Sequence, residues 1–82
     1  MSKPEERTEV NVRTVVAELR RARQMYDKID HAWTGITIIL DRTNKLLIAL
    51  KNLDTQLARK RATQVAAMAI RFMDDLFKES EV

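Results

Sequence analysis

The chain has 82 residues, a net charge of +3, no cysteine, one glycine and one proline. The lack of cysteine excludes disulfides and thiolate metal sites as the device that stabilises so short a chain. The scarcity of glycine and proline disfavours sheets and folds with many turns. Hydrophobic residues at 45% and charged residues at 33% are typical of long amphipathic helices. We therefore expect an all-α protein, stabilised by the association of copies.

The expected domain organisation is simple. Residues 1–7 are polar and are predicted to form a flexible N-terminal arm. Thr8 is the expected N-cap, since its hydroxyl can accept a backbone N–H of the first helical turn. Residues 8–79 then form a single helical domain, and residues 80–82 form a polar tail.

An apolar stripe dominates the first two thirds of the chain. Apolar residues recur at alternating gaps of three and four from Val12 to Leu50, which is the spacing of one face of an α-helix. Such a stripe must be buried against another helix, so we predict one long amphipathic helix that self-associates. The residues expected to be buried between chains are Leu19, Tyr26, Ile29, Trp33, Ile36, Leu40, Leu47 and Leu50.

A second set of apolar residues widens the stripe to three positions. A face this wide favours a helical bundle over a strict two-stranded coiled coil. Ile38 and Ile48 lie off the widened face. The flanking set comprises Met25, Ala32, Ile39, Leu46 and Leu53.

Gly35 is the first candidate break in the long helix, because a glycine just past a helix end can close its last turn. The stripe keeps its register across this glycine, which favours a continuous helix, and a turn at 34–35 remains the alternative. The tripeptide Trp33-Thr34-Gly35 lies between two helical halves and resembles the turn motif of the small secreted WxG helical-hairpin proteins of specialised bacterial secretion. The resemblance covers three residues and implies a hairpin turn here. The basic charge and the unbroken stripe depart from that family's pattern.

The second candidate break is a hinge near residues 52–55. Asn52, Asp54 and Thr55 can each bond to nearby backbone and favour caps over helix interiors. A shorter helix is then expected from about Thr55 to Lys78. It would fold back on the first helix as a hairpin or bundle, or continue it.

Candidate catalytic and metal-binding residues are few. His31 follows Asp27 by four residues, a spacing that can bind metal or move protons, but both lie off the stripe and are expected to be solvated. Asp74 and Asp75 are adjacent, so they point in different directions on a helix and are expected to be surface charges. One glycine cannot build a phosphate-binding loop. We expect no catalytic site, no metal site and no cofactor.

Two basic clusters favour a competing function. Lysine and arginine side chains that contact phosphates give salt-sensitive, sequence-independent binding to nucleic acid. A small dimeric nucleic-acid-binding protein is therefore the alternative hypothesis. Its candidate contacts are Arg20, Arg21, Arg23, Arg59, Lys60 and Arg61.

The sequence as a whole favours a non-enzymatic structural, assembly or adaptor protein that acts through helix packing. The expected partners are copies of the same chain or another helical protein. No signal peptide is visible, and the most apolar stretch, 33–50, contains charged residues that exclude a membrane span. A cytoplasmic location is the default expectation.

Overall fold

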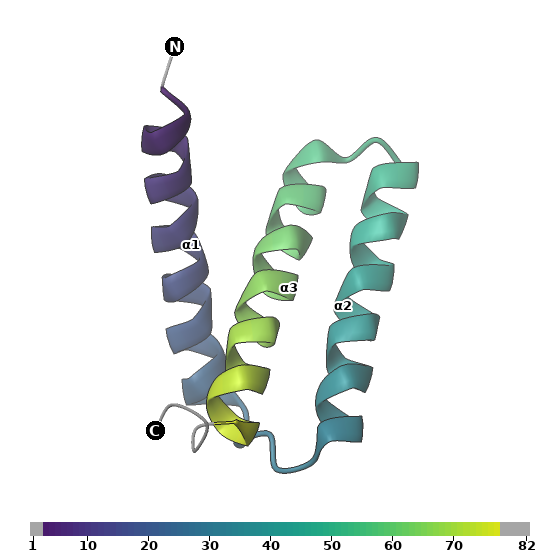
Figure 1. Cartoon of the computed structure of the whole chain (residues 1–82). Helices are drawn as coiled ribbons and strands as arrows, with labels where there is room; N and C mark the ends of the chain where they lie inside the picture. The colour runs from purple at the N-terminus through teal and green to yellow at the C-terminus, as the bar shows by residue number, and fades with distance from the viewer. Residues whose placement is uncertain (1–2, 78–82) are drawn as a thin grey trace.

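The computed structural model describes residues 3–77, which form three helices (Figure 1). These are α1 (Pro4–Met25), α2 (Ala32–Lys51) and α3 (Thr55–Leu76), and residues 3–77 contain no strand. The prediction of an all-α fold is confirmed. The predicted polar tail at 80–82, and the predicted last helical residues 78 and 79, lie outside the described residues.

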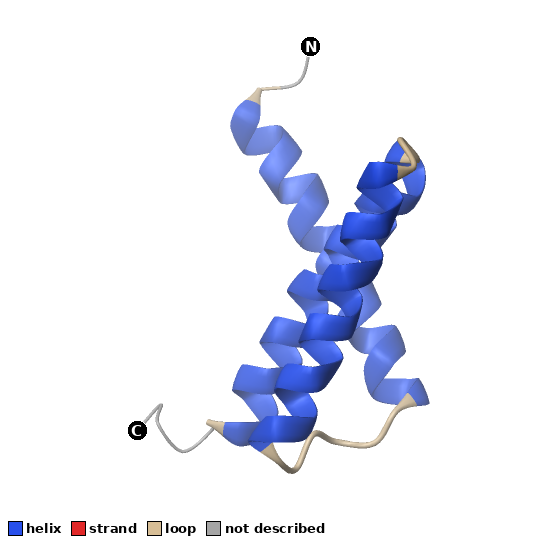
Figure 2. Ribbon diagram, turned by 90° about the vertical axis from the view of Figure 1, so that its right-hand side faces the viewer, coloured by secondary structure: helices blue, strands red, loops and turns tan. Residues whose placement is uncertain are grey.

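The central helix of the fold is α3, which packs on one side against α1 and on another against α2. No Cα of α1 lies within 8 Å of a Cα of α2. In the side view, α2 and α3 run alongside each other while α1 crosses behind them at a marked angle (Figure 2). The arrangement is therefore a helical hairpin, α2–α3, with the backbone of α1 packed on α3.

The first helix begins earlier than predicted. Its N-cap is Lys3 and its first residue is Pro4, followed by the acidic residues Glu5 and Glu6. Proline at the first helical position has a suitable φ and lacks only an N–H that would be unpaired anyway, and acids favour the positive helix end. Residues 4–7, predicted as part of the arm, are thus helical. Thr8 is not the N-cap; its hydroxyl donates to the carbonyl of Pro4 at 3.0 Å.

The prediction of one long helix through residue 50 is wrong, because the helix is interrupted between Met25 and Ala32. Tyr26 and His31 adopt extended backbone conformations at the two ends of the break. The Nδ1 atom of His31 accepts the N–H of Trp33 at 3.2 Å and so caps α2. Gly35 lies inside α2, so neither the turn at 34–35 nor the hairpin turn implied by the WxG resemblance is present.

The end of α3 holds the segment 26–31 in place. Arg71, which is only 3% exposed, donates from Nη2 to the backbone carbonyl of Asp27 at 2.6 Å. The Oδ2 atom of Asp75 accepts the N–H of Ile29 at 2.9 Å, and the Ile29 side chain is buried. The expectation that Asp75 is merely a surface charge is therefore wrong: it pairs a backbone donor that would otherwise lie unsatisfied.

Asp74 behaves differently from its neighbour. Its carboxylate forms an ion pair with Arg23 at the end of α1, and both side chains remain 48% exposed. An exposed pair of this kind contributes about 0–1 kcal/mol. The two adjacent aspartates thus point in different directions, as predicted: Asp74 contacts the last turn of α1, and Asp75 contacts the segment 26–31.

The turn between α2 and α3, at residues 52–54, lies within the predicted hinge at 52–55. Asp54 is the N-cap of α3, and its Oδ1 atom accepts the N–H of Leu57 at 3.0 Å. The N–H of Asp54 bonds back to the carbonyl of Ala49 at 3.0 Å. Leu53 has a φ of 55°, a conformation that costs free energy for a leucine, and its side chain points into solvent.

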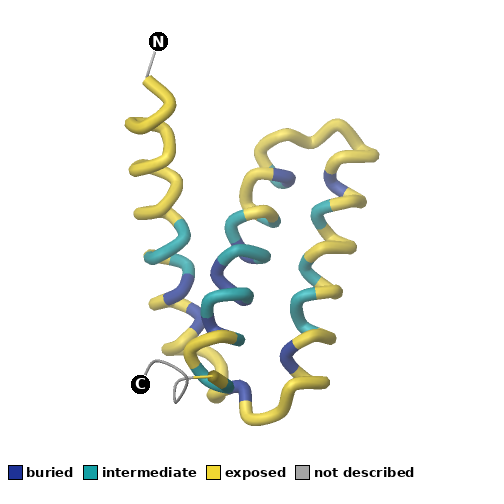
Figure 3. Tube along the Cα trace, in the orientation of Figure 1, coloured by how far each residue is buried: buried dark blue, intermediate teal, exposed yellow. Residues whose placement is uncertain are grey.

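The core is small and is built around short side chains. Ala22 of α1 and Ala67 of α3 are fully buried beside Leu19 and Met68, so α1 and α3 approach closely. Ile38 and Ile39 of α2 pack against the same cluster. Figure 3 shows the consequence: burial concentrates along α3 and on the sides of α1 and α2 that face it.

Gly35 permits the close approach of α2 to α3. A Cβ atom at this position would lie 2.7 Å from Cε2 of Phe72, closer still to Cδ2 of the same ring, and 3.2 Å from Cγ2 of Ile29. Gly35 therefore costs helix propensity, about 1 kcal/mol against alanine, but it makes room for the aromatic ring.

We expect Gly35→Ala to lower the free energy of unfolding by about 1–3 kcal/mol, because overpacking against Phe72 outweighs the gain in helix propensity. Urea unfolding followed by circular dichroism measures the change. The double variant Gly35→Ala/Phe72→Leu should recover part of the loss. A single variant as stable as the wild type would show that α2 and α3 do not pack this closely.

The two adjacent aspartates allow a matched test of how much the contact of Asp75 with the segment 26–31 contributes to stability. Asp75→Ala should cost about 1–3 kcal/mol, because it leaves a buried N–H without a partner. Asp74→Ala removes the same charge from an exposed ion pair and should cost about 0–1 kcal/mol. Urea unfolding of the two variants tests this ranking, and a greater loss in Asp74→Ala would contradict it.

Candidate association face and basic cleft

The second helix carries two apolar faces. Its inner face, toward α3, contains buried or half-buried residues that recur at intervals of three, four or seven, with neighbouring Ile38 and Ile39 both half-buried. The residues of this inner face are Gly35, Ile38, Ile39, Arg42, Leu46 and Ala49. Ile38, which the stripe left unexplained, thus belongs to the packing against the core.

A second side of α2, adjacent to the inner face and which we name the outer stripe, is exposed. It consists of Trp33, Ile36, Leu40, Leu47 and Leu50, with exposed fractions from 39% to 75%. At about 100° per residue these positions fall within an arc of about 100°. Figure 3 shows the side of α2 turned away from α3 as exposed. A contiguous apolar face of this kind typically marks an interaction site.

The hydroxyls of two threonines on this side of α2 already have hydrogen-bond partners. The hydroxyl of Thr37 donates to the carbonyl of Trp33 at 2.8 Å, and the hydroxyl of Thr43 donates to the carbonyl of Ile39 at 2.8 Å. Thr43 is the position where the apolar repeat is interrupted. Because its donor is paired within the helix, burying this face would leave no hydroxyl proton without a partner.

The structure places the predicted self-association residues in three different settings. Leu19 and Ile29 are buried within the single chain, at 7% and 3% exposure. The prediction that these two residues are buried between chains is therefore wrong. Tyr26 is 48% exposed in the segment between α1 and α2. The remaining residues, Trp33, Ile36, Leu40, Leu47 and Leu50, form the outer stripe.

The predicted basic residues also divide. Arg21, Lys60 and Arg61 line a cleft of about 520 Å³, which we name the basic cleft. Arg59 lines a groove that shares Arg21 and Lys60 with this cleft. Arg23 instead pairs with Asp74. Arg20 is exposed and lines neither the cleft nor the groove.

The predicted nucleic-acid contacts do not include the residues of α2 that complete the basic cleft. Arg42 and Lys45 line it from α2, opposite Glu18 and Arg21 of α1. Arg42 fits the spacing of the inner face and Lys45 precedes Ala49 by four residues, and this spacing was the available signal. The cleft therefore brings together all three helices.

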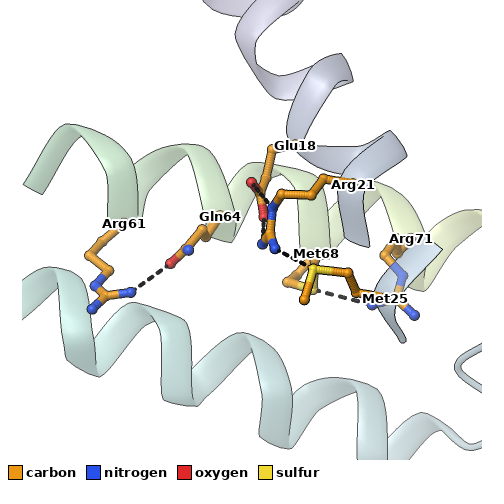
Figure 4. A network of polar contacts seen from close by, with 7 residues as sticks. All are labelled: Glu18, Arg21, Met25, Arg61, Gln64, Met68 and Arg71. Carbon is orange, nitrogen blue, oxygen red and sulfur yellow. Dashed lines mark hydrogen bonds and ion pairs between the residues drawn. The ribbon is translucent and has the colours of Figure 1, made fainter. Parts of the chain in front are cut away.

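Glu18 is the acidic residue of the basic cleft. Its two carboxylate oxygens accept hydrogen bonds from Nε and Nη2 of Arg21, at 2.9 and 2.6 Å (Figure 4). The hydrogen bond from Arg21 is the main reason that the pKa of Glu18 is lowered from 4.5; burial opposes this effect, and the positive charges of Lys60 and Arg42 reinforce it. Glu18 is thus held as a carboxylate among cations.

His31 and Asp27 lie in the segment between α1 and α2, so their four-residue spacing does not place them on one helix face. His31 caps α2 through Nδ1, and Asp27 contributes its backbone carbonyl to Arg71. Across residues 3–77 no three histidine, cysteine or acidic side chains gather in a metal-binding arrangement. None of the helices in this range has a stretch long and apolar enough to cross a bilayer.

Comparison with protein-family models, with curated proteins and with solved structures finds no match to this chain.

The lowered pKa of Glu18 predicts a pH-dependent contribution to stability. A carboxylate whose pKa is depressed on folding stabilises the fold above its unfolded pKa, and this contribution is lost as the pH falls through the folded value. Glu18→Gln should therefore reduce the free energy of unfolding at pH 7 but have a much smaller effect near pH 3. Urea unfolding of both proteins across this range measures the difference. A difference that stays constant with pH would contradict the assignment.

Proposed function

We propose that this protein is a non-enzymatic assembly or adaptor protein, and that copies associate through the outer stripe of α2. The observation that carries the proposal is the exposure of this stripe, in which Trp33 is 75% and Leu40 is 57% exposed. Large apolar side chains aligned on one helix gain free energy when removed from water, about 25 cal/mol per Å² of apolar surface. Both of these residues can be buried without disturbing the contacts of α2 with α3.

The spacing of the stripe supports a second copy of the chain as the partner. In an antiparallel pair of α2 helices related by a twofold axis, Trp33 would lie opposite Leu50, and Ile36 opposite Leu47. Leu40 would then meet Thr43, whose hydroxyl is already paired. A surface that complements itself under a twofold rotation is what a symmetric dimer requires.

The size of the chain also supports association. A single chain of 82 residues buries few large side chains: among residues 3–77, no large side chain is fully buried, and the core relies on Ala22, Ala49 and Ala67. Small domains with modest cores are commonly stabilised by association. Pairing of two outer stripes would supply a second apolar layer on the open side of α2.

Leu40→Glu should convert the assembly to a monomer of 9.5 kDa while the helices remain folded. The side chain is exposed in the single chain, so the new charge opposes burial between copies without disturbing the fold. Light scattering after gel filtration gives the mass, and circular dichroism gives the helix content.

The matched control is Thr34→Glu, which adds the same charge to an exposed position on the same helix, outside the outer stripe. It should retain the mass of the wild type. A wild-type protein that is monomeric at high concentration, or a Leu40→Glu variant that keeps the assembled mass, would refute self-association through this face.

A further inference from the structure

The basic cleft concentrates positive charge from all three helices. Five cationic side chains line it, from α1 (Arg21), α2 (Arg42, Lys45) and α3 (Lys60, Arg61), against the one carboxylate of Glu18. Because α1 and α2 do not approach each other closely, the cations are held apart by the helices that carry them. Charged walls of one sign around a cleft focus the electrostatic potential within it.

The ion pairs near the cleft leave part of this charge uncompensated. Arg21 pairs with Glu18, and Asp41 contacts both Arg42 at 2.7 Å and Lys45 at 3.2 Å. Asp41 lies outside the lining of the cleft and is half-exposed. Even when Asp41 is counted with Glu18, two carboxylates stand against five cations, so the cleft retains a net positive charge that an anion would neutralise.

Arg61 contributes a buried donor without a partner. Its Nη1 atom donates to Oε1 of the buried Gln64 at 3.1 Å, and Figure 4 shows the side chain extending from α3 toward the ribbon of α2. Its Nε atom is buried and has no hydrogen-bond acceptor. A buried guanidinium donor that lacks an acceptor costs free energy. Gln64 thus holds one terminal nitrogen of a guanidinium that lines the cleft.

We propose that the basic cleft binds an anion with several closely spaced phosphate groups. Arginine donors match phosphate oxygens in geometry, and lysines add charge. The volume of about 520 Å³ is within the range of small-molecule sites. The groove lined by Arg59 continues from the cleft through Arg21 and Lys60, so a chain of phosphates has a path beyond it. A single carboxylate would use only a fraction of these donors.

The chemistry of closely spaced phosphates has two sources: a free polyphosphate, including a nucleotide, and the backbone of a nucleic acid. Calorimetric titration of the full chain with tripolyphosphate tests the first, and titration with duplex DNA tests the second, each at low and at moderate salt. Binding should weaken steeply with salt, because phosphate contacts release counterions. Tight binding of tripolyphosphate alone identifies a compact ligand, and binding of DNA through the same residues identifies a nucleic-acid backbone.

The matched comparison uses two double variants with the same change in net charge. Lys45→Gln/Lys60→Gln removes two cations from the cleft and should weaken binding about tenfold or more, since both lysines face the ligand. Lys3→Gln/Lys51→Gln removes two cations that do not line the cleft, so it should change the binding affinity less than about threefold. Equal losses in both would show that only net charge matters, and would overturn the site.

A gain of affinity provides the second test. Glu18→Gln removes the carboxylate and releases Arg21, so it should tighten binding of tripolyphosphate severalfold at pH 7. Loss of folding would weaken binding and so cannot produce this gain. No binding by the wild type to either probe at low salt, or weaker binding by Glu18→Gln, would overturn the proposal. None of these substitutions alters the outer stripe, so the result is independent of self-association.

Discussion

The fold depends on the contacts that the end of α3 makes with the segment between α1 and α2. Breaking a helix at residues 26–31 leaves backbone groups without their helical partners, and such groups must be paired if they are buried. Arg71 pairs the carbonyl of Asp27, and Asp75 pairs the N–H of Ile29. The buried Ile29 side chain adds an apolar contact at the same place. These interactions allow the chain to bend here, and they set the direction in which α2 leaves.

The bend determines which apolar face of α2 is used inside the chain. Because Gly35 has no side chain, α2 lies against the ring of Phe72, and the face containing Ile38 and Ile39 turns toward the core. The outer stripe is then directed away from α3. One chain of this size offers no further helix among residues 3–77 to cover it. Its exposure is thus a consequence of how tightly the α2–α3 hairpin packs.

The same arrangement gives the space between α1 and α2 a polar character. These two helices share α3 as a neighbour but do not approach each other, so long charged side chains lie between them. Glu18 with Arg21, and Arg61 with Gln64, occupy this region with their polar ends (Figure 4). The chain therefore carries two surfaces of different chemistry: an apolar stripe on the outside of α2, and a cationic cleft between the helices.

The sequence by itself determined the helical class, the turn around Asp54 and the apolar stripe on α2, because these features depend on residues within a few positions of one another. It did not determine the break at 26–31. Ile29 suits the heptad spacing of a continuous helix, and the bend depends on contacts with residues far away in the chain, such as Asp75, 46 residues from Ile29, and Arg71. The assembly of the basic cleft from Arg21, Arg42 and Lys60 likewise depended on how three helices pack. Local periodicity indicates which side of a helix is apolar, whereas tertiary contacts decide which apolar side is buried and which is left exposed.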